Sequence, residues 1–188
     1  SPTIPLDTLR CFERIEAFAS DLLLHNKKFI AVGGDHSITL PLLRSVKKKY
    51  GPLRLIHFDA HLDTYPAAWD CEYHHGSFLR HAVLEGLLKE NQCVQIGIRG
   101  PLAESADLNF AKEHGFRTVT VDDIRDPGLT QFLTKALPPM DDTPTYVTFD
   151  IDCLDPAYAP GTGTPVVGGL TTYETQRILR TLKIPNLV

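Results

Sequence analysis

Apolar and polar residues alternate along the chain with two different periods, which predict helices and strands in turn. Apolar positions recur three or four residues apart in five segments, which we interpret as helices: 7–25, 37–50, 77–90, 102–115 and 170–182. A sixth helix is expected near Leu129–Leu137. Short apolar runs between them predict strands at 27–34, 53–58, 93–98, 117–121 and 145–150. This alternation indicates a mostly parallel sheet covered on both faces, a three-layer α/β/α fold.

Composition and charge argue against nucleic acid and membranes as binding partners. The 188 residues suffice for one domain, and the net charge of −4 comes without a basic block of the kind that binds nucleic acid. No apolar run approaches the roughly 18 residues of a membrane span, and the N-terminus has no secretory hydrophobic region. We therefore expect a cytoplasmic protein. The four cysteines form no CxxC pair, and Cys93 and Cys153 are predicted to be small buried residues.

Charged residues collect directly after three predicted strands. They form the clusters "GGDHS" with Asp35 and His36, "DAHLD" with Asp59, His61 and Asp63, and "DIDCLDP" with Asp150, Asp152 and Asp155. Parallel sheets bind ligands outside the carboxyl ends of their strands. In extended chain, side chains at i, i+2 and i+4 point to the same side, so we expect the members of each cluster to converge.

Electrostatics indicates what such a cluster would hold. Four aspartates crowded at one sheet edge could not all remain ionised unaided, because burial and like-charge repulsion raise carboxyl pKa values. Two divalent cations would balance them, and a carboxylate-rich ligand set with two imidazoles and no sulfur suits manganese. A lone Asp-x-His is more often a turn or a cap. Asp35 could be such a structural residue, bonding local amides or orienting His36.

The three clusters resemble the signature motifs of the ureohydrolases, the arginase–agmatinase family. The similarity extends over about residues 29–180, and "DAHLDTY" and "PGTGTPVVGGL" are closest to the agmatinase branch. The resemblance implies an arginase-like fold and two manganese ions per subunit. One ion would be bound by His36, Asp59, Asp63 and Asp150, and the other by Asp59, His61, Asp150 and Asp152. It also implies that Asp63 holds a bridging hydroxide and that the protein forms trimers or hexamers.

The loop "CEYHHGS" resembles the family's His-Gly segment. His75, which directly precedes Gly76, would then be the acid–base residue, with His74 as its competitor. The implied reaction is attack of hydroxide on a guanidinium carbon, which releases urea and an amine. Agmatine would yield putrescine. Asp155 is expected to support a ligand or form a turn, and Trp69 and Tyr73 to line the path of the substrate tail or to pack the loop.

The resemblance is incomplete. Family members are longer, and the glutamate that grips the substrate guanidinium has no visible counterpart, so we expect a fragment of one ureohydrolase domain with weak activity. A guanidino-acid hydrolase such as guanidinobutyrase would share every motif, and neither Arg80 nor Arg99 can be assigned to a carboxylated tail. A non-catalytic binding or regulatory relative is a further alternative. The single-zinc deacetylases of arginase-like fold are disfavoured by six ligands.

Overall fold

The computed structural model describes residues 7–68, 70–102, 105–135 and 140–188, and these group into two compact units. The first unit comprises 1–53 and 63–89 with residue 188, and the second comprises 54–62 and 90–187. No helix in the described ranges is both long and apolar enough to cross a bilayer.

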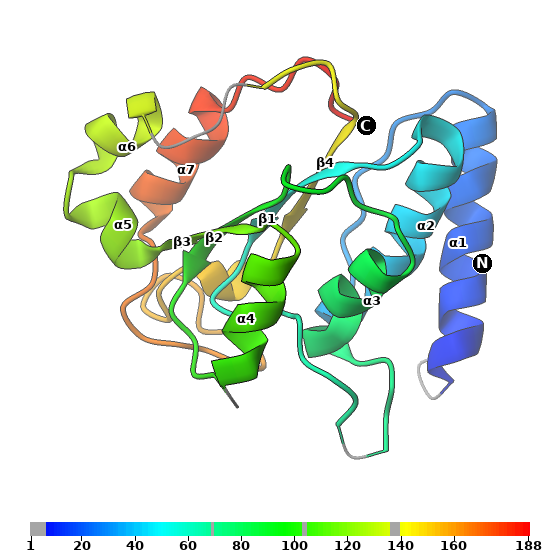
Figure 1. Cartoon of the computed structure of the whole chain (residues 1–188), viewed down its shortest axis with the longest axis horizontal. Helices are drawn as coiled ribbons and strands as arrows, with labels where there is room; N and C mark the ends of the chain where they lie inside the picture. Colours follow the sequence, from blue (N-terminus) through cyan, green and yellow to red (C-terminus); the bar gives the residue numbers. More distant parts are fainter. Residues whose placement is uncertain (1–6, 69, 103–104, 136–139) are drawn as a thin grey trace. The chain divides into compact units, whose positions relative to one another are not determined.

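A four-stranded parallel sheet forms the centre of the second unit (Figure 1). The strands lie in the order β3-β2-β1-β4 and comprise β1 (Arg54–Phe58), β2 (Val94–Ile98), β3 (Arg117–Thr120) and β4 (Thr145–Phe149). Every residue of the two central strands, β1 and β2, is buried. Continuous burial is typical of parallel strands that are covered on both faces, and it explains why apolar residues predominate in these two strands.

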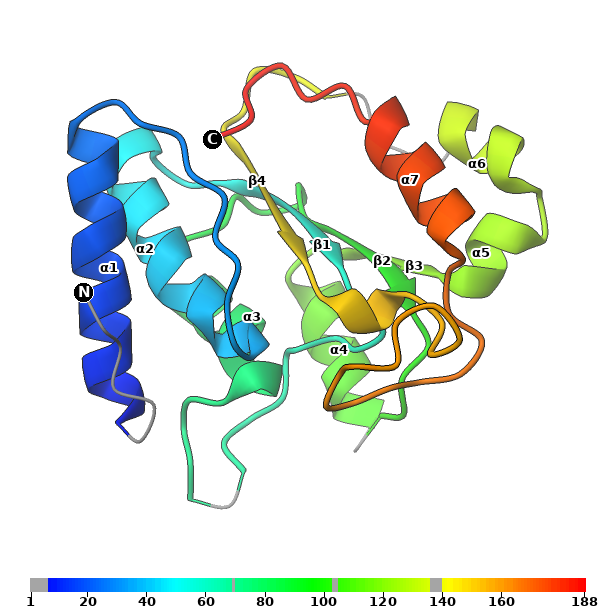
Figure 2. The same ribbon diagram turned by 180° about the vertical axis from the view of Figure 1, so that it is seen from behind.

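Helices of the second unit pack on this sheet. They are α4 (Ser105–Glu113), α5 (Val121–Arg125), α6 (Leu129–Lys135) and α7 (Thr172–Thr181). Figures 1 and 2 show α5, α6 and α7 side by side. Ile124, Phe132 and Ile178 of these helices join Ile56 and Ile96 of the central strands in one apolar core. A capping box begins α7, because the side chain of Thr171 accepts from the amide of Glu174 and the Glu174 carboxylate accepts from the amide of Thr171.

The first unit consists of helices that pack on one another. They are α1 (Thr8–Leu24), α2 (Thr39–Tyr50) and α3 (Phe78–Leu84). Ser45 of α2 donates its hydroxyl to the carbonyl of Glu16 in α1 at 3.0 Å. A bidentate pair, with both oxygens of Glu85 within 2.7 Å of Arg44 nitrogens, ties α2 to the residue that follows α3.

Three sequence predictions about elements were wrong. The run 27–34 forms no strand, and Ile30 and Val32 are each 94% exposed because no described strand pairs with this segment. The helix expected over 77–90 ends at Leu84, since Gly86 adopts φ 63° and turns the chain. The strand expected to run to Val121 stops one residue earlier, because Thr120 caps the short helix α5.

Candidate metal centre

The candidate site of the second unit lies at the carboxyl ends of β1 and β4. Asp59 directly follows β1, and its amide donates to the carbonyl of Ile96 at 3.1 Å. Asp150 directly follows β4, and its amide donates to the carbonyl of Phe58 at 2.8 Å. Neighbouring parallel strands thus deliver two of the three charged clusters to one edge of the sheet, as the topology predicts.

Asp59, His61 and Asp152 bring their potential ligand atoms within 4.8 Å of one another. The Nδ1 atom of His61 lies 3.1 Å from Asp152 Oδ2 and 3.4 Å from Asp59 Oδ1. Both carboxylates are held by backbone amides: Asp59 accepts from His61 at 2.6 Å, and Asp152 accepts from Ala60 at 3.0 Å. Thr164 also donates its hydroxyl to Asp152 at 3.1 Å. Hydrogen bonds within the chain therefore orient these side chains.

The charges in this group are strongly coupled. Hydrogen bonding to Asp152, and then to Asp59, raises the pKa of His61 to about 10. Burial raises the pKa of the Asp152 carboxyl, and the nearby charge of Asp59 acts in the same direction, while the hydrogen bond from His61 opposes both. At neutral pH a proton on His61 partly neutralises the two carboxylates. A divalent cation would do the same with more charge.

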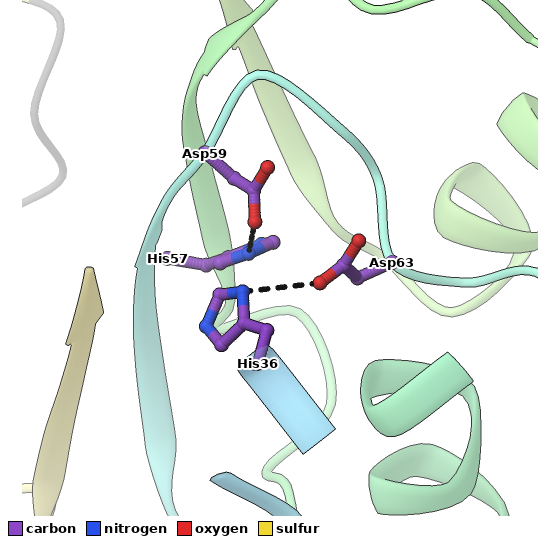
Figure 3. Close-up of side chains that lie close together, drawn as sticks. All are labelled: His36, His57, Asp59 and Asp63. Atoms are coloured by element: carbon purple, nitrogen blue, oxygen red, sulfur yellow. Dashed lines mark hydrogen bonds and ion pairs between the residues drawn. The ribbon is translucent and has the colours of Figure 1, made fainter. Parts of the chain in front are cut away.

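A second polar pair, His36 and Asp63, lies in the first unit. His36 Nδ1 is 3.1 Å from Asp63 Oδ2, and both side chains are buried (Figure 3). His36 begins a short 3-10 helix whose cap is Asp35, which accepts from the amide of Ser37 at 2.9 Å. Asp35 therefore has the local structural role that was one of its two expected functions.

Asp63 owes its position to an unusual backbone conformation. Its φ is 52°, in the left-handed region that aspartate tolerates better than most residues. The Asp63 carbonyl accepts from the amide of Leu79 in α3 at 3.1 Å. The chain turns here, so Asp63 does not continue a strand.

The extended interpretation of two clusters was therefore wrong, although the side chains of Asp59 and His61 do meet, with Nδ1 of His61 3.4 Å from Oδ1 of Asp59. The chain bends at Ala60 and His61 because Asp59 accepts the His61 amide in a local turn. Asp150 and Asp152 lie in a 3-10 turn (Ile151–Cys153), where the side chain of Asp150 caps the amide of Asp152 at 2.9 Å. Short turns, and not strand alternation, orient these carboxylates.

His57 is a polar residue of the site that the sequence interpretation missed. It lies fully buried on β1, and its Nε2 is 2.8 Å from Asp59 Oδ2 (Figure 3). Gln95 on β2 is its register partner and places its amide nitrogen 3.2 Å from His57 Nδ1. An amide donor at Nδ1 leaves the proton on Nε2, so His57 donates to Asp59. The available signal was the spacing of Asp59, His61 and Asp63, because the same two-residue step taken toward the N-terminus leads from Asp59 to His57.

The loop of the first unit holds the candidate acid–base histidine. His74 caps the turn at His75–Ser77, and its Nε2 lies 3.0 Å from the carbonyl of Pro66. His75 makes no side-chain hydrogen bond to another residue in the described ranges, and its ring meets that of His74 edge-on at 5.8 Å. His74 is thus committed to the loop, whereas the His75 imidazole has no such partner.

The other loop candidates pack or turn the chain, as far as the structure describes them. Tyr73 lies edge-on to Phe12 at 5.7 Å and beside His81 at 4.4 Å. Asp155 accepts the amides of three residues that follow it, Ala157, Gly168 and Gly169. Trp69 lies outside the described residues.

A parallel sheet with a buried carboxylate–imidazole group at its carboxyl edge defines an α/β protein with a candidate metal centre. Comparison with known proteins identifies its family. The chain belongs to the arginase family, whose model matches residues 2–188. It is 44% identical over 182 residues to the agmatinases of Enterobacter sp. (strain 638) and Escherichia coli, covering 97% of this chain and 56% of each relative. The chain thus spans about half the length of the curated relatives it matches.

Solved structures confirm the predicted fold class. Proclavaminate amidino hydrolase from Streptomyces clavuligerus is 40% identical, with a TM-score of 0.88 over 98% of this chain and 62% of that one. A hypothetical agmatinase from Burkholderia thailandensis is 37% identical, with a TM-score of 0.87 over all of this chain and 57% of that one. The fold is therefore the arginase-like α/β fold with a parallel sheet.

Proposed function

We propose that the protein that carries these residues is a manganese-dependent ureohydrolase that converts agmatine to putrescine and urea. The observation that carries this proposal is the group of Asp59, His61 and Asp152, whose ligand atoms lie within 4.8 Å at the carboxyl edge of the sheet. The 44% identity to agmatinases supports the choice of substrate.

The donor set fits a manganese centre. Its atoms are carboxylate oxygens and imidazole nitrogens, a combination that favours manganese over softer metals. The raised pKa of His61 and the buried carboxylates of Asp59 and Asp152 support the proposal, because a cation would balance the negative charge that a proton on His61 otherwise offsets. We propose two Mn²⁺ ions, held by the ligands that the motifs suggest: His36, Asp59, His61, Asp63, Asp150 and Asp152.

Residues around the ions would divide the chemistry. When bound, manganese would supply a nucleophile from water at neutral pH and would stabilise the charge that develops on the substrate. Asp63 would accept a hydrogen bond from the attacking oxygen and hold it in line with the guanidinium carbon. His57, by donating to Asp59 at 2.8 Å, would keep that carboxylate in one orientation.

The leaving amine needs a proton, and we assign its delivery to His75. Two observations support this residue over His74. The side chain of His74 is bound to the Pro66 carbonyl, and the backbone of His74 caps the turn that carries His75, with its amide donating to Ser77 Oγ at 3.0 Å. A histidine without such a structural commitment is available to exchange a proton with substrate and water.

A guanidino acid is the second candidate substrate. The similarity to proclavaminate amidino hydrolase, at 40% identity, favours it. Recognition of a carboxylated tail would require a free cationic side chain. Arg99 is unsuited to this role because its guanidinium is bonded to backbone carbonyls, and Arg80 donates from Nη1 to the carbonyl of Thr64 at 3.3 Å.

Metal titration and a urea assay test the proposal. We expect two Mn²⁺ per chain by calorimetry, and urea from agmatine in preference to arginine and 4-guanidinobutyrate. Removal of the metal with a chelator should abolish turnover, and Mn²⁺ should restore it. Undiminished turnover after chelation would refute the metal mechanism. Faster turnover of 4-guanidinobutyrate than of agmatine would refute agmatine as the substrate and favour a guanidino acid. Metal binding without urea release from any of them would favour a non-catalytic relative.

We also propose a homo-oligomer, a trimer or hexamer, on the basis of the family resemblance. Helix α1 carries large apolar side chains that another subunit could cover, since Leu9, Phe18 and Leu24 are more than half exposed. Sedimentation velocity at micromolar concentration measures the assembly, and a monomer would contradict this part of the proposal.

A further inference from the structure

Arg99 directly follows β2, and its guanidinium is surrounded by backbone carbonyl oxygens. Nη1 donates to Gly97 at 3.1 Å and Cys153 at 3.2 Å, and Nη2 donates to Asp152 at 2.8 Å, Leu154 at 3.2 Å and Val166 at 2.6 Å; Nε donates to Val167 at 3.2 Å. Six acceptors for five N–H groups leave no donor for a ligand. The side chain is therefore committed to the protein itself.

The backbone of Arg99 binds the bend that carries Asp59 and His61, the other two members of the ligand group. The amides of Arg99 and Gly100 both donate to the carbonyl of Ala60, at 2.9 and 2.7 Å. Ala60 lies between Asp59 and His61, at the bend that brings their side chains together. Arg99 thus contacts the β1 loop through its amide and the turn of Asp152 through its guanidinium.

The segment that follows Asp152 is shaped around this guanidinium. Asp155 accepts the amides of Gly168 and Gly169, at 2.8 and 3.0 Å, and so returns the chain to the same point. Gly169 could carry no larger side chain, because an added Cβ would overlap Arg99 Nη2 and lie 2.5 Å from the amide of Asp155. The loop passes this close only because glycine has no side chain.

We propose that Arg99 is the positioning residue of the metal centre: it fixes the turn of Asp152 against the bend of Asp59 and His61 without touching metal or substrate. This inference deepens the proposed function and rests on it for the identity of the ligand. A planar guanidinium is suited to the role because its donors diverge in fixed directions. A lysine ammonium, a single point, could reach only some of these carbonyls.

Two variants and a matched control test the inference. Arg99→Met removes all donors and keeps an apolar stem, and Arg99→Lys keeps the charge. Arg54→Met removes another buried guanidinium, which binds Gln92 and Asp141 at the opposite end of β1. All three are expected to lower the midpoint of chemical unfolding, so stability alone does not distinguish them.

Two site-specific readouts do distinguish them. The first is hydrogen exchange of the Ala60 amide in metal-free protein, because this amide donates to Asp152 Oδ1. The second is Mn²⁺ affinity by calorimetry, with the electron paramagnetic resonance spectrum of the bound ions. Arg99→Met should accelerate exchange of the Ala60 amide beyond the change in global stability and should weaken Mn²⁺ binding about tenfold or more. Arg54→Met should change neither, and Arg99→Lys should not restore either.

The outcomes separate the two proposals. If Arg99→Met retains both the Ala60 protection and the Mn²⁺ affinity of the parent, the positioning role is refuted. If Arg99→Lys restores both, charge alone suffices and the multipoint argument is wrong. If the parent chain binds no Mn²⁺, the proposed function fails, while the Ala60 amide still decides whether Arg99 holds the ligand group together.

Discussion

Gly100→Ala should damage the metal centre without altering any ligand. A Cβ at this position would lie 2.6 Å from His61 Cδ2, 3.1 Å from His61 Nε2 and 3.0 Å from the carbonyl oxygen of Ala60. Carbon atoms pack at about 3.5–4.0 Å, so the imidazole must retreat by about 1 Å. The Ala60 carbonyl cannot yield easily, because it accepts two amides.

The size of the effect follows from that displacement. Overpacking of a buried site costs about 1–3 kcal/mol, which should appear as a lower free energy of unfolding in the metal-free chain. Displacement of a ligand from its orientation typically weakens metal binding by about 10–100-fold. We expect Mn²⁺ affinity, measured by calorimetry, to fall within that range for Gly100→Ala.

Gly161→Ala is the matched control. Gly161 is exposed, its φ lies outside the left-handed region, and an added Cβ would meet no atom within 4 Å. The control should keep the parent's stability and Mn²⁺ affinity. If Gly100→Ala also binds Mn²⁺ with the parent's affinity, then His61 is not held against Gly100 as a ligand, and the assigned geometry of the centre is incorrect.

Three further predictions concern the ligands and the acid–base residue. Asp150→Ala should abolish both Mn²⁺ binding and urea release, since it removes a proposed bridging carboxylate; retained binding of two ions by calorimetry would contradict that assignment. His75→Ala should lower kcat about 10²–10⁴-fold with Mn²⁺ stoichiometry intact, and an equal loss in His74→Ala would argue against the choice between them. Mn²⁺ must displace the proton that His61 holds up to its raised pKa of about 10, so apparent affinity should rise by up to about tenfold per pH unit from pH 6.5 to 8.5. In the metal-free chain the same raised pKa gives stability that is fully present below about pH 6.5 and is lost as pH rises through about 10. A flat affinity profile across this range would contradict the prediction.

Most of the sheet could be predicted from the sequence because its central strands are buried on both sides. The runs at β1 and β2 are buried along their whole length and rich in apolar residues, which marks them as strands. The run at 27–34 has a similar composition, but strand formation depends on a neighbouring backbone that local sequence does not reveal. Ile30 and Val32 are exposed for that reason.

The candidate site was predictable in its residues more than in its geometry. Charged clusters after strands identified Asp59, His61 and Asp152, because parallel topology brings strand ends together. The bend at Ala60 and the 3-10 turn after Asp150 depend on side chains that bond to nearby amides, which period-two reasoning cannot detect. His57 was missed because a histidine inside an apolar strand looks like part of the core.

Asp63 must satisfy two separate requirements, one on its left-handed backbone and one on its side chain. The position needs a side chain that tolerates φ 52° and also a carboxylate within 3.1 Å of His36. Asparagine tolerates the same backbone and removes only the charge, whereas glutamate keeps the charge and tolerates the backbone less well. The backbone conformation therefore limits the choice of side chain before the charge does, and a longer acidic residue is not a conservative replacement for Asp63.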